Sequence, residues 1–111
     1  MQVDKREKFT ILGDDENNVE EFASFLAYII PKSFKQENLV IDLLKYEKMS
    51  LDQLLEFLVL SNKRRAANKS FVLVNKAVAI DRIPAELIVV PTMGEAKDVI
   101  DLEEIQRELG F

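Results

Sequence analysis

Ser50 is the residue of this chain that could most readily take part in a chemical switch, because it directly precedes an apolar pattern of helical spacing. A serine at the exposed head of a helix can accept a phosphate, which would meet free backbone N–H groups there. Gln53 follows three residues later, and this spacing also predicts a plain N-cap with a capping-box partner. The sequence favours the N-cap and leaves phosphorylation of Ser50 as an alternative.

Three residues just before this serine have side chains that suit a protein contact, namely Tyr46, Lys48 and Met49. They follow an apolar run of strand length, so we expect them at the carboxyl end of a sheet, where open α/β folds present their sites. An amphipathic tyrosine and a flexible methionine are good contact residues for a protein partner. Partial burial of both over the following helix agrees equally well with the pattern.

A group of carboxylates at the start of the first expected helix raises the question of a calcium site. The group lacks the alternate spacing and the central glycine of an EF-hand loop, so it is better explained as a solvated loop and helix start. Its members are Asp14, Asp15, Glu16, Glu20 and Glu21.

The chain contains no histidine and no cysteine. This composition excludes catalytic triads with a histidine base, zinc sites that need histidine or cysteine, thiolate nucleophiles and disulfides. The glycines Gly13, Gly94 and Gly110 are too far apart to form a phosphate-cradling loop. We therefore expect no enzymatic activity, no cofactor and no metal, although an unfamiliar enzyme that uses only carboxylates and lysines stays as a remote alternative.

The charge balance argues against nucleic acid and membrane partners. The chain carries 20 acidic and 15 basic residues, so its surface should repel phosphate groups. No apolar run approaches the roughly 20 residues that span a bilayer, and none has the length of a signal peptide, which predicts a cytoplasmic protein. The basic cluster at Lys63, Arg64, Arg65 and Lys69 is expected to complement a helix C-terminus and aid solubility rather than to bind phosphate.

The N-terminal third is expected to hold one strand region and one helix. Residues 9–12 are β-prone and end at a Gly-Asp-Asp turn, while residues 3–7 either extend this strand or form a bent partner. Asn18 and Glu21 have capping-box spacing and open a helix that should end at Pro31.

The remaining elements alternate between strands and helices. Residues 39–44 read as an interior strand covered on both faces, and residues 51–68 as one helix. Residues 71–74 and 87–90 are two further strands, with at most a short helical turn between residues 79 and 86. This order predicts a mainly parallel sheet with right-handed crossovers in a single domain.

The C-terminal segment is expected to be helical in two parts. Thr92 opens a helix through Ile100, and Asp101 could cap a further segment. An apolar edge on this segment either folds back over the sheet or joins a partner, and Gly110 as a C-cap favours folding back. The edge consists of Leu102, Ile105, Leu109 and Phe111.

Four local sequences follow one another in an order shared with one family. Asn38-Leu39-Val40-Ile41-Asp42-Leu43 looks like a central strand ending in an aliphatic-Asp-Leu sequence, and residues 51–69 look like a long helix with a basic end. Ser70-Phe71-Val72-Leu73-Val74-Asn75 looks like the next strand, and Pro91-Thr92-Met93-Gly94-Glu95-Ala96 like the last strand-to-helix turn. With these motifs at this spacing, residues 39–100 resemble a STAS domain, the fold of bacterial anti-sigma factor antagonists.

The resemblance implies an α/β, STAS-like domain over residues 1–111, with a four- or five-stranded mainly parallel or mixed sheet, about four helices and an extended C-terminal helical segment at about residues 101–111. Phosphorylatable members carry Asp-Ser-Ser-Gly before the second helix, which here falls on Ser50-Leu51-Asp52-Gln53. The serine positions hold Leu51 and Asp52, so the phosphoserine site is degenerate. Asp52 either supplies a fixed negative charge there or simply favours the first helical turn.

The resemblance also implies a function. We expect a non-enzymatic regulatory protein that binds a protein partner, either an anti-sigma factor or a kinase-like regulator. A small-ligand sensor is the alternative, and the oligomeric state stays open. The expected partner surface consists of Tyr46, Lys48, Met49, Ser50, Asp52 and Gln53, with Asp14 and Asp15 beside it.

Overall fold

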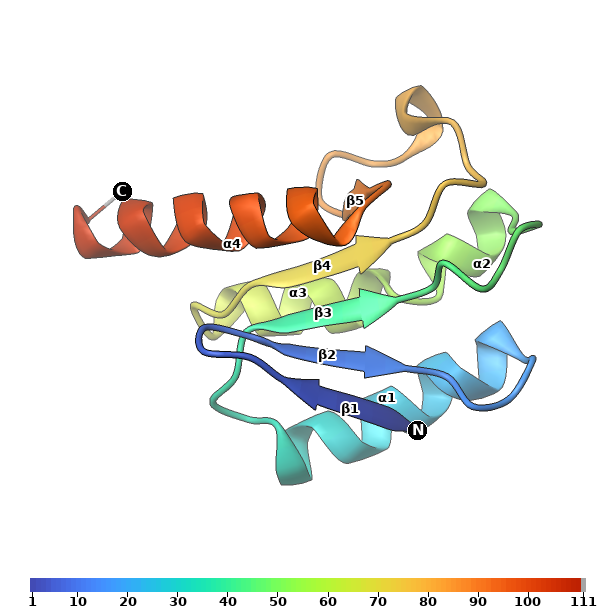
Figure 1. Ribbon diagram of the computed structural model, residues 1–111, viewed down its shortest axis with the longest axis horizontal. Helices are drawn as coiled ribbons and strands as arrows, with labels where there is room; N and C mark the ends of the chain where they lie inside the picture. Colours follow the sequence, from blue (N-terminus) through green and yellow to red (C-terminus); the bar gives the residue numbers. More distant parts are fainter. Residues whose placement is uncertain (111) are drawn as a thin grey trace.

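The computed structural model describes residues 1–110, apart from the side chain of Ile80 (Figure 1). The elements along the chain are β1 (Gln2–Lys5), β2 (Thr10–Gly13), α1 (Val19–Ser33), β3 (Leu39–Asp42), α2 (Leu51–Leu55), α3 (Leu58–Ala66), β4 (Phe71–Val74), a 3₁₀ turn η1 (Ile80–Arg82), β5 (Ile88–Val90) and α4 (Met93–Glu108).

The strands form one five-stranded mixed sheet in which spatial order equals chain order. β1 runs antiparallel to β2, and β2 to β5 are all parallel. The α/β class and the mixed sheet agree with the prediction. Of the two alternatives for residues 3–7, the structure has a partner strand, β1, which covers Gln2–Lys5 and so includes only part of that range.

Helices cover both faces of this sheet. α1 and α3 lie behind it in Figure 1, as right-handed crossovers that advance in one direction require. Their apolar side chains pack against the face that carries Leu39, Ile41 and Leu73. On the other face, Val40 and Val72 pack against α4. Because side chains alternate along a strand, β3 and β4 are buried on both faces, which confirms the interior strand predicted at residues 39–44.

The predicted helix over residues 51–68 is divided into α2 and α3 at residues 56 and 57. The interruption coincides with Phe57, whose ring is fully buried and meets Phe22 of α1 edge-on, with the ring centroids 6.4 Å apart. α1 also departs from the prediction, because it continues through Pro31 to Ser33. Pro31 has no N–H to donate to the carbonyl four residues earlier, but it lies close to the C-terminal end, where the helix runs on for only two more residues.

α4 is one continuous helix rather than two capped segments. Glu103 in its C-terminal half accepts hydrogen bonds from Arg65 and from Ser70, at 2.9 and 2.6 Å. This polar face turns toward the sheet, so Leu102 and Ile105 turn away and are 56% and 52% exposed. The prediction that the apolar edge folds back over the sheet is therefore wrong for the described residues; Phe111 lies outside them.

Candidate functional site

The candidate surface is the edge of the sheet where β2, β3, β4 and β5 all end. The loops at residues 14–18, 43–50 and 75–79 leave the strands there, at the right of Figure 1, beside the first turns of α1 and α2. Parallel strands that end together bring residues from distant parts of the chain to one place.

Tyr46 and Asp14 form the centre of this edge. The half-buried hydroxyl of Tyr46 donates a hydrogen bond to the carboxylate of Asp14, which is only 8% exposed. Burial, reinforced by this hydrogen bond and by the charge of Asp14, raises the pKa of Tyr46 well above its ordinary value. Asp14 also accepts from the backbone N–H of Glu16 at 2.9 Å, so its carboxylate holds the loop together. Sequence analysis expected Asp14 beside the surface that contains Tyr46, and the structure joins the two side chains directly.

Lys45 and Asn75 complete the loop scaffold, and sequence reasoning missed both roles. The ammonium group of Lys45 donates to the carbonyls of Asp14 and Glu16, the first at 2.9 Å. Nothing in the sequence distinguishes this lysine from a solvated one.

The side-chain amide of Asn75 donates to the carbonyls of Leu43 and Tyr46, at 2.9 and 3.1 Å. Its carbonyl oxygen accepts from the backbone N–H of Ala77 at 2.8 Å. One signal could have revealed this role. Asn75 comes directly after the apolar run that forms β4, so it would be expected at the sheet edge where that strand ends.

Ser50 and Gln53 form the predicted capping box at the start of α2. The Ser50 hydroxyl oxygen accepts from the N–H of Gln53, and the Gln53 side chain accepts from the N–H of Ser50, both at 3.1 Å. Ser50 and Asp52 are exposed, as is Lys48 in the preceding loop. Met49 is instead 8% exposed and belongs to the core, so it holds the loop and offers little contact surface.

A hollow of about 440 Å³ separates the head of α2 from the loop after β4. Met49, Ser50 and Asp52 line one side of it, and Val78 and Arg82 line the other. In the loop after β2, Asp15 pairs with the N-terminal amine of Met1. Among residues 1–110, no group of three or more carboxylates is placed to hold a metal ion.

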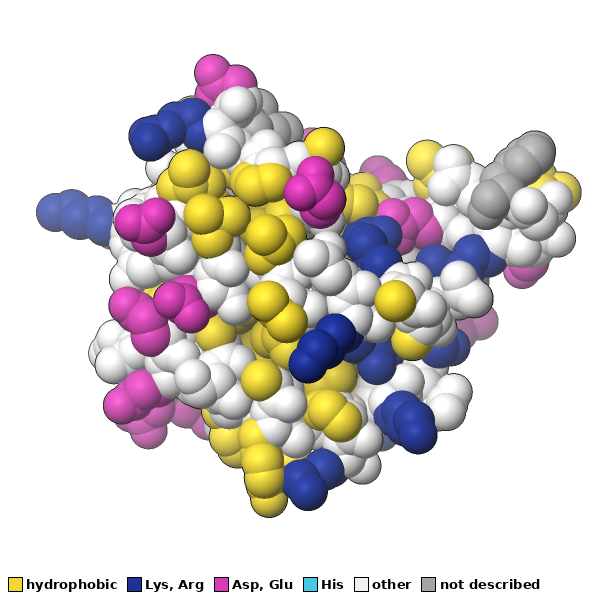
Figure 2. Space-filling model, turned by 180° about the vertical axis from the view of Figure 1, so that it is seen from behind, with side chains coloured by type: hydrophobic (Ala, Val, Ile, Leu, Met, Phe, Trp, Pro, Cys, Tyr) yellow, Lys and Arg dark blue, Asp and Glu magenta, His cyan; other side chains and the backbone are white. Residues whose placement is uncertain are grey.

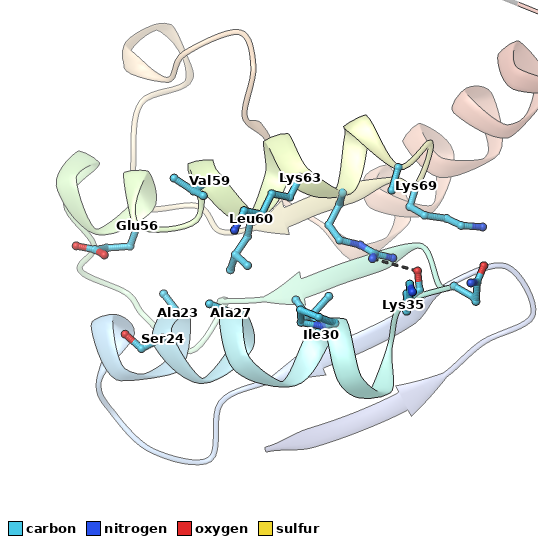
Figure 3. A pocket seen from close by; sticks show the side chains of 14 residues that line it. Ala23, Ser24, Ala27, Ile30, Lys35, Glu56, Val59, Leu60, Lys63 and Lys69 are labelled. Atoms are coloured by element: carbon cyan, nitrogen blue, oxygen red, sulfur yellow. Dashed lines mark hydrogen bonds between the residues drawn. The ribbon is translucent and has the colours of Figure 1, made fainter.

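A second concave site lies away from this edge, between α1 and α3. It is a groove of about 530 Å³ with Ala27, Ile30 and Leu60 in its wall and Lys35 and Lys63 at its rim (Figure 3). Sequence analysis did not predict this groove, because it arises from the packing of two helices that are far apart in the chain.

One member of the basic cluster, Arg64, forms its contacts inside the protein. The Arg64 guanidinium is buried and donates to the carbonyls of Phe34 and Lys35, at 3.2 and 3.1 Å, and to that of Glu37. It therefore satisfies carbonyl groups beyond the end of α1, which corrects the expectation of a solvated charge for this residue.

No protein-family model matches the chain, and no curated protein sequence matches it either. Within the part of the chain that the structure describes, no helix has the length and apolar character needed to cross a membrane.

Proposed function

We propose that this chain is a cytoplasmic, non-enzymatic regulatory protein with a STAS-like fold, and that it acts by binding a protein partner as antagonists of anti-sigma factors do. The order of elements supports the STAS-like assignment. The residues that resemble the family run from β3 to α4. The loop that carries Ser50 is followed by α2 and then by α3, which has the basic end.

The observation that carries the proposal is how the polar groups at the carboxyl edge are used. Tyr46 is hydrogen-bonded to Asp14, and the Asn75 side chain is hydrogen-bonded to the backbone of the loops around it. These side chains therefore hold the loops in place. A general base or nucleophile needs a free group aimed at a substrate, whereas a binding surface gains affinity from loops that are already fixed. The bonding pattern therefore favours recognition over catalysis.

Exposed side chains then supply the contacts. Lys48, Ser50 and Asp52 project from the fixed loop and from the first turn of α2. Asp52 carries a permanent negative charge where phosphorylatable members have serine, so the surface should exist in one constitutive form. The proposed partner is an anti-sigma factor or a kinase-like regulator whose contact surface complements one basic and one acidic side chain.

Affinity purification from the source organism tests this proposal. We expect the wild type to recover an anti-sigma factor or a histidine-kinase-like ATPase. The double variant Lys48→Glu, Asp52→Lys should lose that protein, because the charge pattern is reversed without touching the core. Lys32→Glu, near the end of α1 at the opposite edge of the sheet, is the control and should retain it. Equal recovery by the double variant would contradict the proposed surface.

Phosphorylation tests the constitutive form separately. We expect no phosphate on the wild type after incubation with the co-purifying kinase and ATP. Phosphate mapped to Ser50 by mass spectrometry, and absent from Ser50→Ala, would restore a switch at this position.

The hollow beside Ser50 favours the alternative of a small-ligand sensor. Its volume of about 440 Å³ falls within the range of small-molecule sites, and Arg82 and Asp52 offer opposite charges to a polar ligand. Recovery of a metabolite with the purified protein, and of no regulatory protein, would support this alternative over the proposed partner.

A further inference from the structure

The groove between α1 and α3 has an apolar wall made by small residues. α1 places Ala23, Ser24 and Ala27 along the groove, and these short side chains leave the space beside Leu60 of α3 unfilled. Val59 stands at the rim and is 61% exposed. The lining of α1 runs from Ala23 to Pro31, which corresponds to about 12 Å along a helix axis.

The two ends of this groove differ in charge. Figure 3 shows Glu56 at one end and Lys35 with Lys69 at the other, while Lys63 stands between them. None of these lysines forms an ion pair with the described residues. Figure 2 shows the same face with apolar side chains across its middle and basic side chains gathered on one side. A cationic, apolar groove is unusual on a chain whose net charge is −5.

The outer face of α4 has the opposite character. Leu102, Ile105 and Leu109 recur at intervals of three and four residues on one side of the helix, and they are 56%, 52% and 65% exposed. From the first to the last of them is about 10 Å along the axis. Asp98 and Glu108 are exposed beside this stripe.

The basic residues of α4 are directed elsewhere. Arg107 donates to Asn38 and Ser70 on the opposite side of the helix, and Lys97 pairs with Asp101 at 2.7 Å. The stripe is therefore apolar with an acidic border, and it matches the groove in length and complements it in charge.

We propose that the α1–α3 groove binds the α4 stripe of a second copy of this chain. The stripe cannot enter the groove of its own chain, because α4 lies on the other face of the sheet and its C-terminal half reaches beyond the strands (Figure 1). Acidic side chains bordering the incoming stripe meet Lys35 and Lys63, and the leucines fill the space beside Ala27. Each contact joins two different surfaces. Two chains that each place their stripe in the other's groove form a closed dimer, whereas chains that each bind the stripe of a further copy build a larger assembly.

Sedimentation equilibrium over a concentration series tests this proposal. We expect the wild type to associate with rising concentration and less so at high salt, because part of the attraction is between exposed charges. Ile105→Lys and Lys63→Glu should each weaken association about tenfold or more. Lys76→Glu makes the same charge change at an exposed position outside the groove and should leave association unchanged. All three positions lie on the surface, so the thermal melting midpoint should stay close to the wild-type value.

Mixing two variants gives the sharpest result. The Ile105→Lys chain keeps an intact groove, and the Lys63→Glu chain keeps an intact stripe, so an equimolar mixture should associate at lower concentration than either chain alone. A monomeric wild type at every concentration, or a mixture that associates no more readily than either chain alone, would overturn the proposal. Binding of a fluorescent long-chain fatty acid by a monomeric wild type, lost in Lys63→Glu, would overturn it too and would assign the groove to an anionic amphiphile.

Discussion

The guanidinium of Arg65 lies 2.9 Å from the carboxylate of Glu103, so the end of α3 is joined to α4 although the two helices cover opposite faces of the sheet. Arg65 also donates to the carbonyl of Phe71, and Ser70 donates to the other oxygen of Glu103. Glu103 lies on the same side of α4 as Ala96 and Ile100, which are fully buried against the sheet. These bonds therefore extend the contact of α4 toward its C-terminal end, with Leu102 and Ile105 facing outward.

Glu103→Gln should lower the free energy of unfolding by about 1–3 kcal/mol, because it removes the charge that pairs with a largely buried guanidinium. Urea unfolding measures this loss. Asp4→Asn is the matched control, since Asp4 pairs with Arg6 at an exposed position and its loss should not be measurable. If the two variants unfolded at the same urea concentration, the Arg65 bridge would not be what holds α4.

Ile41→Asp should unfold the domain, because Ile41 is fully buried in β3 and its neighbours offer no partner for a charge. The cost of an unpaired buried carboxylate is several kcal/mol, a large fraction of the stability of a domain this size. Circular dichroism and a thermal melt of the purified variant measure it. Val3→Asp places the same side chain on the exposed edge strand β1 and should melt near the wild type. A cooperative melt of Ile41→Asp at the wild-type midpoint would argue against the interior position of β3.

Local patterns in the sequence predicted most of these elements. The apolar runs at β3 and β4 and the caps at Asn18, Ser50 and Thr92 all depend on neighbours within a few residues, and the structure has each of them. The division at Phe57 was missed; it coincides with contact between Phe57 and Phe22, which lies 35 residues earlier in the chain.

The remaining errors also concern contacts between distant residues. Spacing alone showed that Leu102 and Ile105 share one side of a helix, but not whether that side faces the sheet. In the structure α4 is one helix, in which Ile100 packs against the sheet and Glu103 on the same side meets Arg65 and Ser70. In the same way, the bond between Tyr46 and Asp14 depends on two strands ending side by side, which no local pattern reveals.

Ser50→Ala should lower stability by about 0.5–2 kcal/mol, because it leaves the N–H of Gln53 without its side-chain acceptor. Ser50→Asp keeps an oxygen acceptor at the N-cap and should remain within a few tenths of a kcal/mol of the wild type. Guanidinium unfolding of the three proteins measures both effects. An equal loss in Ser50→Asp would mean that the hydroxyl itself, rather than N-capping, matters at this position.

Tyr46→Phe should make stability less sensitive to alkaline pH. The pKa of Tyr46 is raised in the folded protein by burial and by Asp14, so between the ordinary tyrosine pKa of about 10 and the raised value the folded state keeps a proton that the unfolded state has lost. The stability that Tyr46 contributes is therefore fully present below about pH 10 and declines as the pH rises above it. Urea unfolding at several pH values, for wild type and variant, isolates this contribution from the lysines, which are common to both. The absorbance of tyrosinate supplies a second readout, since Tyr46 should ionise only near unfolding. Parallel pH profiles for wild type and Tyr46→Phe would show that the bond to Asp14 does not hold this hydroxyl in its protonated form.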